Sequence, residues 1–206
     1  MLIDVLPIGP IQTNCYVVTC PETRQALVID PGWPDLLILR VLEGRQATAG
    51  MIVNTHTHWD HIGGNTLLKE KTGAPFGIHR EAAAMLRAKG GAQLWDIPVE
   101  DSPEPDCWLE QGDVLSIGTL HFEVLFTPGH APGHVSLVEH EQGVVFDGDV
   151  LFNRGIGRTD LPGGDHATLV QSIREKLLSL PDATLVYSGH GPVTTIGEER
   201  RENPWL

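Results

Sequence analysis

The feature that most constrains this chain is the run His-x-His-x-Asp-His at positions 56–61, which follows the apolar segment 49–55. An apolar run of this kind is typical of a strand that is covered on both faces of its sheet. Imidazole and carboxylate groups suit borderline metals such as zinc, manganese and iron. Three histidines and an aspartate within six residues indicate a metal site rather than a solvated turn. The pattern therefore predicts a buried strand with a metal-binding loop at its end.

Three further ligand candidates lie in the second half of the chain, each after an apolar run and beside a glycine. Glycine lets the backbone turn sharply and bring a neighbouring side chain close to its target. Each candidate alone is typical of an ordinary polar strand end. Together they favour one site, provided that their strands end at the same edge of a sheet, where α/β active sites are commonly built. These candidates are His130, Asp149 and His190.

Strand and helix patterns alternate along the rest of the chain. Short runs rich in β-branched residues predict strands over 2–8, 14–20, 26–30, 49–55, 75–79, 113–117, 121–130, 134–140, 143–149 and 184–190. Helical patterns cover 35–43, 65–73, 80–90 and 166–180, while 91–106 is expected to be a surface loop and the last residues a tail. This order predicts one α/β domain over residues 1–206, a four-layer αββα sandwich made of two similar halves.

Composition excludes several classes of function. A formal net charge of −13 repels phosphate backbones and anionic lipid headgroups, so we expect no nucleic-acid or membrane partner. No apolar run approaches the ~18 residues of a membrane span, and the first residues do not resemble a signal peptide. The three cysteines form no Cys-x-x-Cys pair and no disulfide framework. We therefore expect a soluble, cytoplasmic protein, and its oligomeric state stays open.

The motifs, taken in order, resemble those of the metallo-β-lactamase superfamily over nearly the whole chain. They are THTHWDH at 55–61, TPGHAPGH at 127–134, FDGD at 146–149 and SGHGP at 188–192. Segments 157–166 and 189–206 are similar to the small bacterial glyoxalase II (hydroxyacylglutathione hydrolase) branch. The resemblance implies the metallo-β-lactamase fold and two divalent metal ions. Zinc is the first expectation, with iron and manganese as alternatives.

The resemblance also implies a role for each candidate residue. Asp60 and Asp149 are the expected catalytic carboxylates. His56, His58 and His130 match the ligands of the first metal ion, Asp60, His61 and His190 match those of the second, and Asp149 matches the carboxylate that bridges both.

Three residues match supporting positions, and each has a plain structural alternative. Asp30 matches a residue that supports a metal-bound histidine, and is otherwise an ordinary turn aspartate. His134 is expected to stabilise its turn by hydrogen bonding rather than to bind metal. Arg158 matches a basic position that contacts the thiol carrier in larger glyoxalase II enzymes, and is otherwise a surface arginine.

The activity implied is hydrolysis of a small-molecule thioester such as S-lactoylglutathione. In such enzymes a hydroxide that bridges the two metal ions attacks the carbonyl, and positive charge stabilises the oxyanion and the leaving thiolate. With 16 residues after His190, we expect no C-terminal helical extension of the kind that supplies much of the glutathione site in the larger enzymes, so the thiol carrier stays open. The alternative is an iron-dependent persulfide dioxygenase, which the chain also resembles around His130, Asp149 and Arg158. A nuclease or a non-catalytic binding protein is disfavoured, because the chain is acidic and no ligand position is lost.

Overall fold

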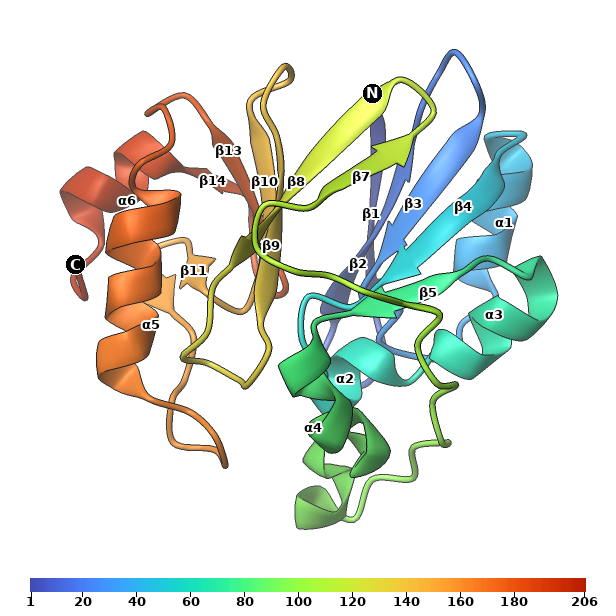
Figure 1. Ribbon diagram of the computed structural model, residues 1–206, viewed down its shortest axis with the longest axis horizontal. Helices are drawn as coiled ribbons and strands as arrows, with labels where there is room; N and C mark the ends of the chain where they lie inside the picture. Colours follow the sequence, from blue (N-terminus) through green and yellow to red (C-terminus); the bar gives the residue numbers. More distant parts are fainter.

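Two six-stranded sheets packed face to face form the centre of the computed structural model, which describes residues 1–206 (Figure 1). The first sheet has the order β1 (Leu2–Ile8), β2 (Thr13–Thr19), β3 (Gln25–Ile29), β4 (Thr48–Val53), β5 (Phe76–Ile78) and β6 (Cys107–Trp108). The second has the order β14 (Thr194–Thr195), β13 (Leu185–Ser188), β10 (Val144–Gly148), β9 (Val135–Glu139), β8 (Leu120–Phe126) and β7 (Val114–Ile117).

Helices cover the outer surfaces of both sheets, which confirms the predicted αββα sandwich (Figure 1). The first half carries α1 (Leu37–Gly44), α2 (Trp59–Ile62), α3 (Asn65–Thr72), η1 (Arg80–Ala82), α4 (Ala83–Arg87) and η2 (Lys89–Trp95). The second half carries α5 (His166–Ser172), which continues as the π-helical turn η3 (Ile173–Leu177), and α6 (Ile196–Glu202). None of these helices is long and apolar enough to cross a bilayer.

The apolar core has three parts, one at each interface between neighbouring layers. Strand β2 shows how the sequence builds them. Cys15 and Val17 pack toward the helices of the first half, whereas Tyr16 and Val18 pack toward the second sheet. Alternate residues of a strand point to opposite faces, so an unbroken apolar strand joins two parts of the core.

Strand direction explains why one edge of the sandwich collects the candidate residues. Strands β3, β4 and β5 are parallel, and so are β10 and β13 in the other sheet. The chain leaves β4 just before 56–61, leaves β10 just before Asp149 and leaves β13 just before His190. The loop with His130 connects the antiparallel strands β8 and β9 at the same edge. The strands that precede the candidate residues therefore end at the same edge, as the prediction of one site required.

The helix expected over 80–90 is wrong in its second part. The chain leaves the α-helix after Arg87, and Gly90 and Gly91 both take left-handed backbone angles, with φ of 61° and 75°. A Cβ on Gly90 would lie 2.2 Å from the backbone nitrogen of Trp59, so this turn packs directly on the motif at 56–61. The 3₁₀ turn η2 then occupies the first part of the expected surface loop.

Several short elements were not predicted. Strand β6 extends the first sheet, the hairpin of β11 (Leu151–Phe152) and β12 (Gly155–Ile156) follows Asp149, and the expected tail forms β14 and α6. Two-residue strands carry too few side chains for a periodic pattern, so only tertiary pairing identifies them.

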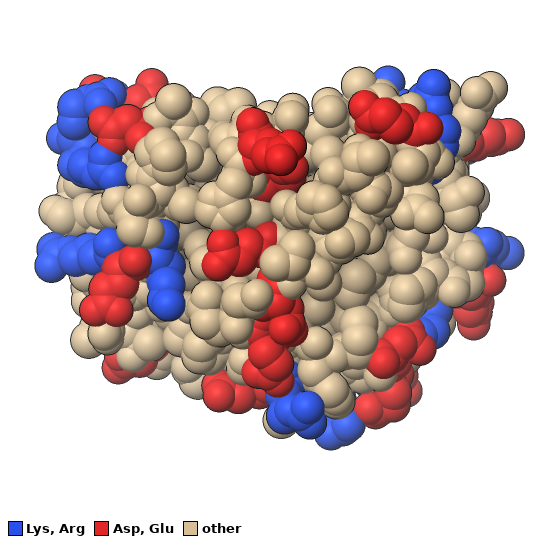
Figure 2. Space-filling view, turned by 45° about the horizontal axis from the view of Figure 1, so that its top comes forward, with Lys and Arg blue, Asp and Glu red and all other residues tan.

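The chain carries 27 aspartate and glutamate residues against 14 lysine and arginine residues. On the face shown in Figure 2 the acidic side chains form a band through the middle, while lysine and arginine gather toward the margins. This distribution agrees with the net charge of −13 and leaves no broad basic surface on that face.

Candidate metal centre

The run at 56–61 divides between a loop and a short helix. His56 and His58 lie in the loop that follows β4, whereas Asp60 and His61 lie on the single turn α2. The expectation that a loop alone presents all four side chains is therefore wrong. His58, with extended backbone angles, directly precedes α2, and this change of direction turns both halves of the motif toward one point.

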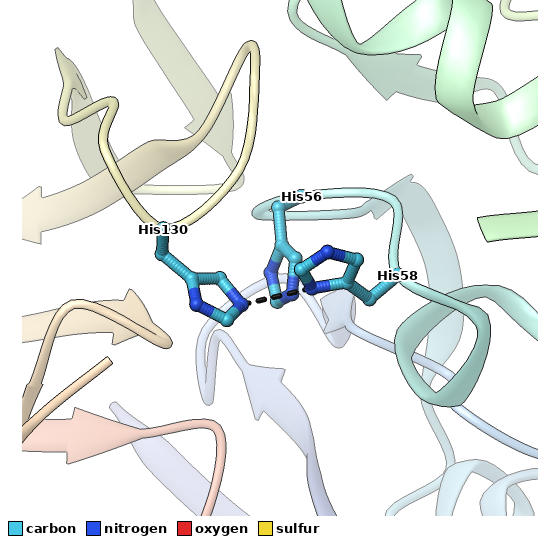
Figure 3. A group of neighbouring side chains, drawn as sticks. All are labelled: His56, His58 and His130. Atoms are coloured by element: carbon cyan, nitrogen blue, oxygen red, sulfur yellow. Dashed lines mark hydrogen bonds between the residues drawn. The ribbon is translucent and has the colours of Figure 1, made fainter. Parts of the chain in front are cut away.

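Three histidines form the first group of the centre (Figure 3). His58 Nδ1 and His130 Nε2 lie 2.8 Å apart. His130 donates a hydrogen bond from Nδ1 to the backbone carbonyl of Arg158, 2.8 Å away, so its Nε2 carries the lone pair. Ring nitrogens of His56, His58 and His130 lie within 4.8 Å of one another, an arrangement that can hold one metal ion.

Asp60, His61 and His190 form the second group. Asp60 Oδ2 lies 3.1 Å from His190 Nε2 and 3.3 Å from His61 Nε2. The hydroxyl of Thr13 donates to the same oxygen over 2.9 Å and so fixes the carboxylate. This group brings together β2, α2 and the loop after β13, and it can hold a second ion.

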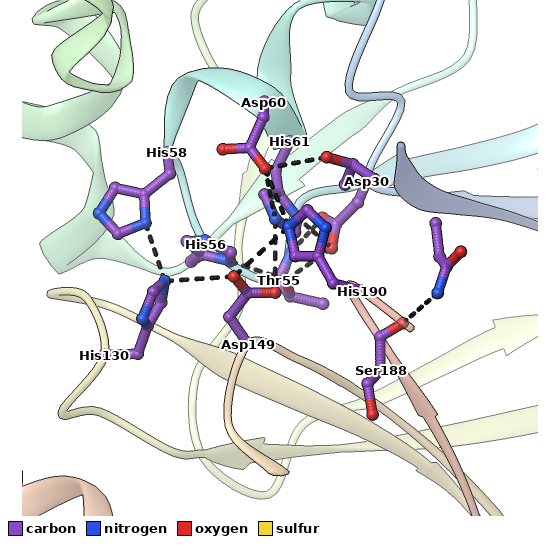
Figure 4. A network of polar contacts seen from close by, with 12 residues as sticks. Asp30, Thr55, His56, His58, Asp60, His61, His130, Asp149, Ser188 and His190 are labelled. Atoms are coloured by element: carbon purple, nitrogen blue, oxygen red, sulfur yellow. Dashed lines mark hydrogen bonds and ion pairs between the residues drawn. The ribbon is translucent and has the colours of Figure 1, made fainter. Parts of the chain in front are cut away.

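Asp149 lies between the two groups (Figure 4). Its Oδ2 is 3.5 Å from His130 Nε2 and 3.7 Å from His190 Nε2, and its Oδ1 is 3.5 Å from His61 Nε2. The turn at Gly189 packs closely against it, because a Cβ there would lie 2.2 Å from Asp149 Oδ1. Asp149 is thus a carboxylate within reach of both groups.

Buried polar atoms without partners test whether these residues fit metal ions. His56 Nε2, His58 Nε2, His61 Nε2 and Asp149 Oδ1 are buried and have no hydrogen-bond partner. Buried nitrogen and oxygen atoms are almost always paired in native proteins, because desolvation of an unpaired group is costly. Four such atoms in one centre are explained if cations bind there, so the donor set fits divalent metals.

The protonation properties of the two groups differ. In the first group, burial and the neighbouring His130 lower the pKa of His58 to about 3, and burial lowers the pKa of His56 well below its usual value. In the second, burial would lower the pKa of His61, but the carboxylates around it raise that pKa well above its usual value. Neutral imidazoles are the form that binds metal, and clustered carboxylates require positive charge. Both groups therefore suit a cation.

Two residues support the centre through hydrogen bonds. Asp30 accepts from His61 Nδ1 at 2.9 Å and from the amide and hydroxyl of Thr55, both at 2.7 Å. Its oxygens are thus occupied, and Asp30 orients His61 instead of offering a free ligand. His134 Nε2 accepts from the Asp149 amide at 3.1 Å, and its Nδ1 lies 3.1 Å from the Thr127 hydroxyl. These contacts match the supporting roles predicted for both residues.

Arg158 stands at the mouth of the site rather than in it. Its guanidinium forms a two-bond contact with Asp160, at 2.8 and 2.7 Å, and its side chain is 55% exposed. Its backbone carbonyl is the group that orients His130. Arg158 therefore has a structural role through its backbone, and its cation is partly neutralised by a neighbour.

A cavity of about 570 Å³ opens over the centre. Its floor includes Asp60, Asp149 and His190, and most of its wall is apolar. Sequence reasoning included one apolar wall residue, Trp59, as part of the motif at 55–61. It did not find Thr13, because the contact of Thr13 with Asp60 spans 47 positions and no motif marks it. The remaining wall residues are Ile11, Trp95, Ile97, Phe152, Ile156 and Leu161.

The four-layer sandwich and its possible histidine and aspartate metal site at one edge are those of the metallo-hydrolase superfamily. A family model described as the Metallo-beta-lactamase superfamily matches residues 8–190, and the chain belongs to this superfamily. Hydroxyacylglutathione hydrolase GloC of Haemophilus influenzae is 40% identical over 209 residues, which cover 100% of this chain and 98% of that protein.

Solved structures of similar proteins carry different descriptions. BLEG-1 B3 metallo-beta-lactamase superposes with a TM-score of 0.94 at 41% identity, covering 100% of this chain and 99% of that one. TTHA1623 in a di-iron-bound form gives 0.90 at 37% identity, with 98% and 100% covered. ETHE1 from Myxococcus xanthus gives 0.84 at 32% identity, with 99% and 84% covered. These similarities show the superfamily but not the substrate, which has to be inferred from the chemistry of the site.

Proposed function

We propose that this protein is a binuclear metal hydrolase of small-molecule thioesters, with S-lactoylglutathione as the first candidate substrate. The observation that carries the proposal is the meeting of seven histidine and aspartate side chains beneath a cavity, five of them in its lining, where buried nitrogen and oxygen atoms lack partners. The full-length similarity to a hydroxyacylglutathione hydrolase supports thioesters as the substrate class.

The proposed ligands follow the two groups and the residue between them. His56, His58 and His130 would hold one ion, Asp60, His61 and His190 the other, and Asp149 would contact both. Zinc is our first candidate, and the di-iron form of TTHA1623 keeps iron as an alternative. Bound there, the ions would supply positive charge that polarises a carbonyl and lowers the pKa of a water molecule.

The chain's own groups prepare the reaction in three ways. Thr13 holds Asp60 through Oδ2, which leaves Oδ1 of Asp60 without a hydrogen bond and able to accept a proton from an attacking water. Asp30 keeps His61 in one orientation. The apolar wall, with Trp59 and Phe152, limits the access of bulk water and so strengthens electrostatic interactions within the site.

The second candidate is an iron-dependent persulfide dioxygenase. The similarity to ETHE1 over 99% of the chain favours it. Against it stands the second group of Asp60, His61 and His190, which is complete and lies in reach of Asp149. A reaction at a single iron ion would not use the ligands of this second group.

The test combines two assays on protein loaded with zinc, iron or manganese. Thiol release from S-lactoylglutathione and other thioesters is measured beside oxygen uptake with glutathione persulfide. We expect thiol release without oxygen uptake. Oxygen uptake with persulfide and no thiol release would support the dioxygenase instead, and hydrolysis of a β-lactam alone would exclude both.

A further inference from the structure

A second cavity, of about 390 Å³, lies directly beside the cavity over the metal centre. It is bounded on one side by α4 and η2, through Ala84, Met85 and Leu94, and on the other by Pro162 of the loop after Arg158. His58, Trp95 and Leu161 line both cavities. A ligand at the metal centre can therefore extend into the second cavity without leaving the protein surface.

The second cavity is apolar and lacks cations. Glu81 is its only acidic lining residue, His58 is shared with the first cavity, and no lysine or arginine lines it. Its volume falls within the roughly 300–1,000 Å³ typical of small-molecule sites. Leu94 and Trp95 on its rim are 58% and 42% exposed, so apolar surface faces water unless a ligand covers it.

We propose that this second cavity is the acyl subsite, and that the enzyme prefers thioesters with apolar acyl chains over the small polar lactoyl group. This inference rests on the proposed thioesterase function. Thiol carriers are polar because they bear amides, carboxylates or phosphates, so the apolar part of a thioester is generally its acyl chain. The carrier then occupies the larger open cavity, where Arg158 offers a polar contact.

A substrate series tests the preference. The enzyme is assayed with acetyl, lactoyl, hexanoyl and 3-phenylpropanoyl thioesters of one carrier, N-acetylcysteamine. Each methylene removed from water changes binding about fourfold, so kcat/KM for hexanoyl should exceed that for acetyl about tenfold or more. Equal values for the whole series would overturn the proposal.

A cavity-filling variant locates the preference. Ala84 is exposed on α4 and lines the second cavity, so Ala84→Phe fills part of that space. Ala167→Phe is the matched control, an exposed alanine on α5 outside both cavities. We expect Ala84→Phe to abolish most of the kcat/KM advantage of hexanoyl over acetyl, whereas the control keeps the ratio of the parent protein. Identical behaviour of the two variants would contradict the assignment.

Direct binding separates this inference from the thioesterase proposal. Hexanoate is titrated into the holoprotein while amide chemical shifts are followed, with acetate as the control ligand. Shifts centred on residues 81–95 for hexanoate only, lost in Ala84→Phe, would support the subsite even if no thioester were hydrolysed. Hexanoate shifts confined to other regions, or none, would overturn the subsite while thioester hydrolysis could still stand.

Discussion

Asp149 connects the two groups of the centre, because its carboxylate lies within 3.7 Å of nitrogens from both. Asp149→Ala should reduce the bound metal below two ions per chain and remove nearly all hydrolysis. His134→Ala removes the supporting hydrogen bond to the Asp149 amide and the contact with the Thr127 hydroxyl, and such losses typically cost about 10–100-fold. Metal analysis and kcat/KM of both variants check this. Equal losses would mean that the assignment of ligands in the second half is wrong.

Substitutions of Arg158 and of its partner Asp160 should change KM in opposite directions. Arg158→Ala should raise KM for S-lactoylglutathione with little change in kcat, the sign of lost uniform binding. Asp160→Asn frees the guanidinium from its ion pair and should lower KM. An exposed ion pair is worth about 0–1 kcal/mol, so each change should stay within about fivefold. Loss of kcat in Arg158→Ala would place this residue in the chemistry.

Single residues also show where sequence reasoning succeeded and where it could not. All seven ligand candidates lie at one edge of the sandwich, because each follows a strand that ends there. The apolar runs indicated these strands, whereas their common direction was only a condition of the prediction. Thr13 and the Asp160 partner of Arg158 were not found. Threonine beside a carboxylate and aspartate beside an arginine are common in any sequence, so only the folded geometry distinguishes these pairs.

Among the elements, α6 has a function that the sequence did not reveal. Glu199 is only 1% exposed, and it accepts from the amide of Arg154, from Thr194 and from Asn203. Asn203 in turn donates to the carbonyl of Gly155. The helix therefore anchors the β11–β12 hairpin, which carries Phe152 and Ile156 into the cavity wall.

Glu199→Ala should consequently lower the free energy of unfolding by about 3 kcal/mol, because buried hydrogen bonds to a charged group are lost and their donors stay unpaired. Hydrogen exchange should rise in residues 151–156. Arg201→Ala, an exposed change on the same helix, should stay within about 0.5 kcal/mol of the parent protein. If denaturant unfolding gave the same value for both variants, α6 would not be the anchor described.

The elements missed by sequence analysis share a physical cause. Strands β6 and β14 and both strands of the hairpin are each two residues long, and their identity comes only from pairing with another strand. The composition of residues 80–90 favours a helix, but the end of this segment belongs to the turn η2 because Gly90 packs against Trp59. This tertiary contact has no local sequence signal. The long strands, in contrast, were found because burial on both faces requires continuous apolar sequence.

For the whole molecule, the proposed ligands come from both halves of the sandwich. Residues 56–61 follow the first sheet, whereas His130, Asp149 and His190 follow strands of the second. Bound metal should therefore hold the halves together. At metal concentrations near 1,000 times Kd the gain is about 4 kcal/mol, equivalent to about 8–16 °C in Tm for a chain of this size. Calorimetry before and after chelation measures this gain. An unchanged Tm would argue against a centre shared by both halves.

The central claim is that one chain binds two divalent ions, and native mass spectrometry tests it most directly. The protein is stripped of metal, titrated with zinc and, separately, with iron or manganese, and the mass of the folded chain is recorded. We predict two ions per chain at saturation, and one at most in Asp149→Ala. A parent protein that never binds more than one ion, even with metal in excess, would contradict it.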